Sequence, residues 1–176
     1  MTVSVSSRID RSFFTYAGEN AGLEEQLAGD SIVPLLSRAR HVHFAMPITA
    51  QLARRLMPEL KTAGCTLSLD VGHQAAWLRD AANRETCATV DFLLPNEREA
   101  RMIAGGDAYT YLDFTRENGW PNGLVKMGAQ GAILRDGDGA LQVRPPEVQA
   151  VDTTGAGDAF NAGFIDGLLD EAPGQE

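Results

Sequence analysis

The chain has 176 residues, of which 44% are hydrophobic and 22% are charged, and its formal net charge at pH 7 is −9. This length and balance are typical of a compact globular domain. The negative charge argues against a nucleic-acid-binding protein and against a membrane-surface protein, because both need a basic surface. No apolar run is long enough to span a bilayer, and the first residues do not form a secretory signal. We therefore expect a cytoplasmic protein.

Two cysteines, Cys65 and Cys87, stand alone in the sequence without Cys-x-x-Cys spacing. Such isolated residues predict buried thiols and favour neither a disulfide framework nor a zinc site.

The chain opens with two apparent strands. Val3 and Val5 indicate the first, and residues 12–16 the second, on either side of residues 7–11. A polar stretch over residues 18–22 predicts a loop after them.

From about residue 40 the chain alternates short apolar runs with helical patterns. The apolar runs predict buried strands over residues 41–45, 66–69, 91–94 and 123–127. The patterns between them predict helices over residues 48–63, 75–80, 97–104 and 109–118, with Gly64 and Gly119 as C-terminal stops. Alternation of this kind implies right-handed crossovers and a mostly parallel sheet flanked by helices. We therefore predict an α/β fold.

The rest of the chain predicts an edge hairpin and a final helix. Residues 132–135 and 141–144, joined by Asp136-Gly137-Asp138-Gly139, favour two antiparallel strands. The last helix is predicted over residues 159–169, where Ala162 and Gly163 suit close packing against the sheet. With no repeat or linker visible, residues 1–176 are expected to form one domain.

The most informative stretch is Asp-Thr-Thr-Gly-Ala-Gly-Asp-Ala-Phe at residues 152–160. A Gly-x-Gly step that opens a helix leaves backbone N–H groups unpaired, and these groups with the helix dipole suit a phosphate. Gly155, Ala156 and Gly157 would present these amides. Asp158 follows at once, and its negative charge would repel a phosphate, so its presence needs a reason. The natural one is to take the proton from a hydroxyl that attacks the phosphorus. The motif therefore predicts phosphoryl transfer, with Asp158 as general base.

Three other interpretations compete for this motif. Asp158 is also a residue type that caps helices, and the glycines suit a tight structural turn. A dinucleotide-binding fingerprint is excluded, because Phe160 stands where the third glycine is needed and too little chain follows for a βαβ unit.

Residues 152–160 resemble the C-terminal signature of the ribokinase-like (PfkB) carbohydrate kinases. Three more stretches are similar to that family and follow its order: Pro-Asn-Glu-Arg-Glu-Ala at residues 95–100, residues 124–132, and residues 10–14 with Gly18. The resemblance implies a three-layer αβα fold and transfer of the γ-phosphate of ATP to a hydroxyl of a sugar, nucleoside or related small molecule.

The resemblance also implies metal and nucleotide sites. Asn96 and Glu99 match the family's Asn-x-x-Glu motif, which acts on Mg²⁺ from its outer shell; as sequence the same pair suits a helix capping box, and both roles are compatible. Asp152 and Thr154 match positions that help hold a monovalent cation such as K⁺, and turn hydrogen bonds are an equal alternative. The nucleotide side would be formed by Lys126, Gly128 and Gly131. For Lys126 a phosphate contact and a solvated strand end stay equally open.

For some residues the resemblance implies no role in the site. Asp70 ends a predicted strand where the family often has Asp-x-Asn-x-Arg, but this chain continues Val71-Gly72-His73, so no role is carried over. His41, His43 and His73 lack metal-ligand spacing, and we expect structural roles for them.

The resemblance begins inside the family pattern and stops soon after the last helix, so we expect a fragment whose residues 1–17 are the end of the lid and the return strand. Two hypotheses stay open: an ATP-dependent kinase, or a catalytically inactive truncated or regulatory remnant of one. The acceptor is also open, because residues that grip the sugar would precede this chain. A homodimer remains an option, since lid strands often form the family's dimer contact.

Overall fold

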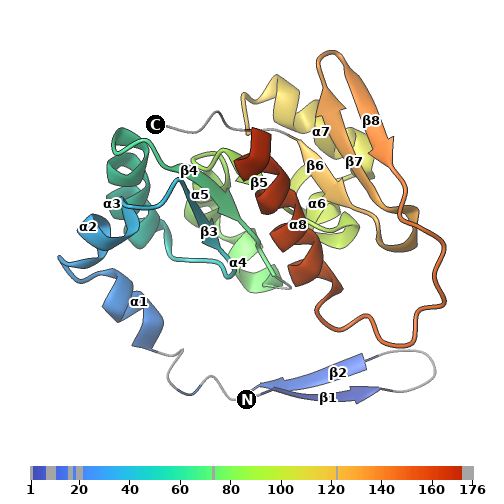
Figure 1. Cartoon of the computed structure of the whole chain (residues 1–176), viewed down its shortest axis with the longest axis horizontal. Coiled ribbons are helices and arrows are strands. Elements are labelled where there is room, and N and C mark those ends of the chain that lie inside the picture. Colours follow the sequence, from blue (N-terminus) through green and yellow to red (C-terminus); the bar gives the residue numbers. More distant parts are fainter. Residues whose placement is uncertain are drawn as a thin grey trace.

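The computed structural model describes residues 2–6, 11–15, 18, 22–72, 74–121 and 123–171. Strands β1 (Thr2–Ser6) and β2 (Arg11–Thr15) pair antiparallel, which confirms the two strands predicted at the start. Figure 1 shows this hairpin apart from the remaining strands and from the helices. Residues 7–10 of the predicted connection lie outside the described residues.

The first part of the main sheet is parallel. Strands β3 (His41–Phe44), β4 (Thr66–Leu69) and β5 (Phe92–Leu93) lie in the order β3-β4-β5. Helix α3 (Ala50–Thr62) connects β3 to β4, and helices α4 (Ala75–Arg79) and α5 (Ala81–Cys87) connect β4 to β5. The predicted strand–helix alternation is confirmed here, and the predicted stops Gly64 and Gly119 have φ angles of 88° and 63°.

The second part of the sheet is antiparallel. Strands β6 (Leu124–Lys126), β7 (Ala132–Asp136) and β8 (Gly139–Val143) follow the helices α6 (Glu97–Ala104) and α7 (Ala108–Glu117). An isolated parallel bridge between Asn96 and Lys126 and a 2.9 Å bond from the Lys126 amide to the Pro95 carbonyl join the two parts. Asp136 pairs with Gly139, so the hairpin turn is tighter than the four-residue connection predicted.

The two faces of the parallel strands are covered differently. Val42, Phe44, Leu67 and Leu69 are buried on one face, in a core with side chains of α3, α6 and α7. The opposite face carries His41, His43, Ser68 and Phe92, and there helix α8 (Ala156–Glu171) lies across the sheet (Figure 1). The rings of Phe92 and Phe164 meet edge to face with centroids 5.3 Å apart. The predicted α/β architecture with helices on both faces is confirmed.

The helix predictions need four corrections. The five-residue helices α1 (Leu23–Leu27) and α2 (Ile32–Leu36) and the seven-residue helix α5 were not predicted. They are too short to show a helical period, and α5 depends on its cap, where Asp80 accepts a hydrogen bond from the Asn83 amide at 3.1 Å. Helix α8 begins three residues before the predicted start, because Gly155 takes a φ of +77° and its carbonyl accepts the Ala159 amide at 2.9 Å.

Cys65 and Cys87 are both free and buried, as predicted. Burial raises the pKa of the Cys87 thiol to about 12, and it also raises the pKa of Cys65. No helix among the described residues is long and apolar enough to cross a membrane.

One buried polar atom of the described residues lacks a hydrogen bond. Tyr111 is fully buried, and its hydroxyl has no hydrogen-bond partner among the described residues. A buried hydroxyl without a partner loses its bonds to water, at a cost of about 1–3 kcal/mol. We expect Tyr111→Phe to raise the free energy of unfolding by about 1 kcal/mol, because it removes the orphaned group and keeps the ring. Urea unfolding measures this, with the exposed Tyr109→Phe as control. A loss of stability in the Tyr111 variant would show that its hydroxyl has a partner after all.

Candidate active site

The candidate site lies where the strands of the sheet end. Asp70 directly follows β4, Asn96 follows β5, and Lys126 is the last residue of β6. Ligands of open α/β sheets bind at this carboxyl edge. An open depression of about 510 Å³ lies here, lined by Asn96, Glu97, Arg98, Arg101, Lys126 and Gly128. The structure thus brings together three residues that the sequence assigned to metal and nucleotide.

The glycine motif forms the exposed start of α8 at the same edge. Residues 155–159 are all exposed. Gly155 has a φ of +77°, and a Cβ added to it would have no atom within 4 Å. The turn therefore needs glycine for its backbone, and the space around it is open. The Ala156 amide donates to the Thr153 carbonyl at 3.2 Å. A phosphate at this turn would compete with the Thr153 carbonyl for the Ala156 amide, and the hydrogen bond to that carbonyl is long.

Asp158 is the third residue of α8 and lies in its first turn. The alternative in which it caps the helix is wrong, because the helix begins two residues earlier. Its side chain is exposed. Burial lowers the pKa of His43, and the negative charge of Asp158 acts on that ring in the opposite direction. A carboxylate in this position suits the helix dipole and remains accessible to a ligand.

Lys126 lies under this turn and is held in place. Its Nζ donates to Asp70 Oδ2 at 2.7 Å and to Asn161 Oδ1 at 3.1 Å, and only 12% of its side chain is exposed. The alternative of a solvated strand end is therefore wrong. A Cβ on Gly157 would lie 3.7 Å from this ammonium group, so the lysine charge is directly below the glycine turn.

Asp70 and Asn161 complete this group. Asn161 Nδ2 donates to Asp70 Oδ2 at 2.6 Å, and the Gly72 amide donates to Asp70 Oδ1 at 2.8 Å. Burial alone would raise the pKa of Asp70, but the hydrogen bond and charge of Lys126, with the bonds from Asn161 and Gly72, lower it below its ordinary value. Asp70 is thus an ionised partner of Lys126 at neutral pH. Neither Asp70 nor Asn161 was predicted from the sequence to have a role in the site.

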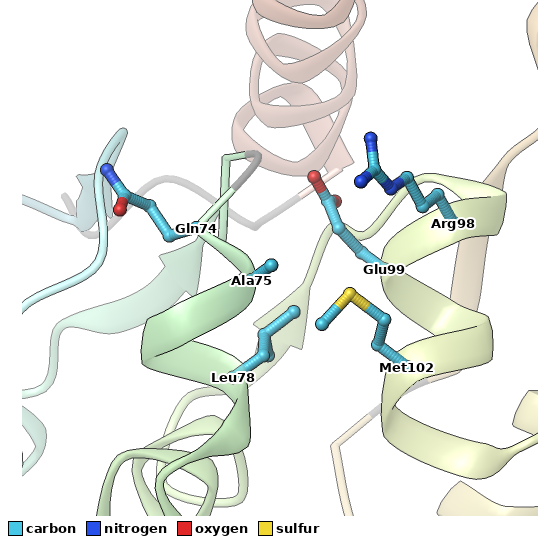
Figure 2. Close-up of a pocket in the computed structure, with 6 residues that line it drawn as sticks. All are labelled: Gln74, Ala75, Leu78, Arg98, Glu99 and Met102. Atoms are coloured by element: carbon cyan, nitrogen blue, oxygen red, sulfur yellow. The ribbon is translucent and has the colours of Figure 1, made fainter.

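Asn96 and Glu99 form the capping box that the sequence offered as one of their two roles. Asn96 Oδ1 accepts the Glu99 amide at 3.0 Å, and Glu99 Oε2 accepts the Asn96 amide at 2.9 Å. Figure 2 shows the Glu99 carboxylate directed away from Leu78 and Met102, toward the N-terminal ends of α4 and α6. Glu99 is only 3% exposed, and the gap beside it between these helices measures about 10 Å³. The box therefore fixes a buried carboxylate at the carboxyl edge of the sheet.

The two glycines after β6 have different surroundings. Gly128 has a φ of +55° and nothing within 4 Å of a Cβ position, so a ligand can approach its backbone. A Cβ on Gly131 would overlap the Val143 carbonyl oxygen. Gly131 is therefore needed by the chain's own hairpin, whatever it does for a nucleotide.

Asp152 makes the turn hydrogen bond that was the alternative to a cation site. Its Oδ1 accepts the Thr154 amide at 2.8 Å, and both residues are exposed. Among the described residues no group of three or more His, Cys, Asp and Glu side chains is arranged to hold a metal ion.

The histidines of β3 bind hydroxyl groups of β4. His41 Nδ1 lies 2.8 Å from Thr66 Oγ1, while His41 Nε2 and His43 Nδ1 lie 2.8 and 2.7 Å from Ser68 Oγ. Burial lowers the pKa of both rings, and the charge of His43 lowers that of His41 further. These hydrogen bonds to β4 support the structural role expected for both rings. His73 lies outside the described residues.

The sequence and the fold of this chain are similar to those of known kinases. The cytidine kinase of Thermococcus kodakarensis is 32% identical over 162 residues, which cover 86% of this chain and 56% of that protein. The structure of Arabidopsis thaliana ribokinase complexed with ribose and ATP matches with a TM-score of 0.76 and 26% identity, over 93% of this chain and 54% of that one.

A putative ribokinase II of E. coli, solved in complex with ATP and Mg²⁺, matches with a TM-score of 0.76 and 21% identity, over 97% of this chain and 58% of that one. The chain thus spans about half the length of the proteins it matches. The model of the pfkB family of carbohydrate kinases matches residues 2–176, and the chain belongs to that family.

Proposed function

We propose that this chain carries the phosphoryl-transfer site of an ATP-dependent kinase that acts on a hydroxyl of a sugar, a nucleoside or a related small molecule. The observation that carries the proposal is the exposed turn Gly155–Asp158 at the start of α8, with the ammonium group of Lys126 beneath it. Such a turn offers amides, a helix dipole and a fixed positive charge to a phosphate, with an accessible carboxylate beside them.

Asp158 acts as the general base in this proposal. The acceptor oxygen forms a bond to the γ-phosphorus, the bond from that phosphorus to the bridging oxygen of ATP breaks, and ADP leaves. The acceptor proton passes to the Asp158 carboxylate. A loose transition state demands little basicity from the attacking oxygen, so an ordinary exposed carboxylate is sufficient if it is well placed.

The amides of Gly155, Ala156 and Gly157 bind the transferring group. They are preorganised by the φ of Gly155 and by the first turn of α8, which the protein builds before any ligand arrives. Lys126 adds a fixed charge from below. Two of its bonds go to Asp70 and Asn161, and a lysine ammonium has three N–H donors, so one donor can turn toward a phosphate oxygen.

Asn96 and Glu99 provide oxygen atoms of the type that Mg²⁺ prefers, at the edge where Lys126 and Gly128 line the depression. We assign them to the outer shell of a magnesium ion, whose charge would offset that of the ATP phosphates. Gly128 and Gly131 border the nucleotide. Asp152 and Thr154 would hold a monovalent cation such as K⁺ through the oxygens of their turn.

We infer the class of acceptor from the acceptors that the names of the relatives give. They include a cytidine kinase, a 6-phosphofructokinase, a ribose-1-phosphate kinase and ribokinases. These acceptors share a free hydroxyl on a sugar, and a hydroxyl is what Asp158 can deprotonate.

The test is transfer of radiolabelled γ-phosphate from MgATP to a panel of these acceptors: ribose, ribose 1-phosphate, fructose 6-phosphate and cytidine. We expect labelled product with at least one acceptor, and none when Mg²⁺ is removed with a chelator. A protein that binds MgATP but labels none of the acceptors above the rate of a no-enzyme control would overturn the proposed function.

A further inference from the structure

Helix α8, which carries the proposed base, has no fully buried apolar side chain among its residues 156–170. Among its residues 156–170 only Asn161 is buried, with 2% of its surface exposed. Phe164 meets Phe92 and Phe160, but both Phe160 and Phe164 are partly exposed. The buried contact of this helix with the sheet is therefore a polar one.

That contact is a closed set of hydrogen bonds. Asp70 Oδ2 accepts from both Lys126 Nζ and Asn161 Nδ2, and Asn161 Oδ1 accepts from Lys126 Nζ. Each of the three side chains thus binds the other two. Asp70 comes from the end of β4, Lys126 from the end of β6, and Asn161 from α8. We call these three residues the Asp70 cluster.

The cluster lies against the first turn of α8. Asn161 follows Asp158 by three residues, and residues three apart lie on neighbouring positions of a helix surface. Lys126 Nζ lies 3.7 Å from a Cβ position on Gly157. A shift of any member of the cluster would therefore move or rotate the turn that carries the amides and the carboxylate.

We propose that the Asp70 cluster positions the first turn of α8 for phosphoryl transfer, so that Asp70 and Asn161 are positioning residues of the reaction. This inference rests on the proposed function. A displacement of about 1 Å of groups that act on the reacting atoms can cost roughly 100-fold in rate. The cluster can therefore control turnover without touching the acceptor.

The experiment compares Asp70→Asn and Asn161→Leu with matched controls. Asp91→Asn is the control for Asp70, because Asp91 also pairs with a lysine, Lys61 at 3.1 Å, and also accepts a backbone amide, that of Leu67. It lies just before β5, at the opposite edge of the sheet. Asn118→Leu is the control for Asn161, since Asn118 is exposed and its side chain, at the C-cap of α7, donates to the Phe114 carbonyl of that helix.

We expect kcat to fall about 10- to 100-fold in both cluster variants while KM for MgATP stays close to the wild-type value. The controls should keep kcat even where they lower stability to the same degree. Lys126→Arg, which retains donors for both partners, should keep more activity than Lys126→Met. A fall of kcat in Asp91→Asn as large as in Asp70→Asn would reduce the cluster to a structural role and overturn the proposal.

A second readout needs no turnover. Hydrogen exchange of the Ala159 amide reports the first bond of α8, to the Gly155 carbonyl. We expect faster exchange in both cluster variants than in their controls, and unchanged exchange would overturn the positioning role. If the wild-type chain transfers no phosphate, the proposed function fails while this exchange experiment still decides whether the cluster holds the turn.

Discussion

Asp158→Asn is expected to slow phosphate transfer about 10²- to 10⁴-fold, because the amide cannot take the acceptor proton. The same variant should bind MgATP nearly as well as the wild-type chain, since the glycine amides and Lys126 are untouched. Asp158 is exposed, so the loss of its charge near the helix N-terminus should lower the free energy of unfolding by no more than about 1 kcal/mol.

Steady-state kinetics with the preferred acceptor and isothermal titration with MgATP separate the two effects. The matched control is Asp166→Asn, an exposed carboxylate on the same helix two turns farther on. It should keep both turnover and MgATP affinity. Equal turnover in the Asp158 variant and the wild type would remove Asp158 from the reaction.

Of the variants proposed here, Gly131→Ala is expected to lower the free energy of unfolding the most, by about 3 kcal/mol. Gly131 has a φ of +89°, which strains any residue with a side chain. Its new methyl group would also overlap the Val143 carbonyl oxygen and lie 3.0 Å from Arg144 Cα. These atoms belong to the backbone, so β8 or the turn after β6 would have to move. The Gly131 carbonyl, which accepts the Met127 amide at 2.7 Å, would move with it.

Gly128→Ala is the matched control for this variant. Gly128 also has a positive φ, +55°, but nothing lies within 4 Å of its Cβ position. The free energy of unfolding of the Gly128→Ala variant should fall only by the conformational cost of the positive φ, about 1–2 kcal/mol. The difference between the two variants in urea unfolding measures the clash with β8. Equal losses would mean that β8 yields to the methyl group without cost.

The sequence could predict the elements whose residues form a clear local pattern. Strand β4 and helix α6 have the predicted bounds, since apolar residues mark the first and the Asn96–Glu99 capping box marks the start of the second. Helices α1, α2 and α5 are shorter than or close to two full turns, so they show no period that the sequence could reveal. Helix α5 has a side-chain cap from Asp80, whereas α1 and α2 have none and pack their apolar side chains, Leu27, Ile32, Val33 and Leu36, against the core.

The candidate site was predictable where it follows one continuous motif. Residues 155–158 do lie exposed at the start of a helix, as their pattern indicated. The Asp70 cluster was not predictable, because its hydrogen bond from Asn161 to Asp70 joins residues 91 positions apart. Residues 71–73 also depart from the family pattern, so the resemblance implied no role for Asp70. What distinguishes Asp70 is its tertiary surroundings, which a single sequence does not show.

The bridge between Asn96 and Lys126 joins the parallel strands β3-β4-β5 to the antiparallel strands β6-β7-β8, so the proposed site lies at the junction of these two groups of strands. Any nucleotide that touched both Asn96 and Gly128 would contact both groups. Its binding free energy would then add to the stability of the chain, and the melting temperature would rise with the nucleotide concentration.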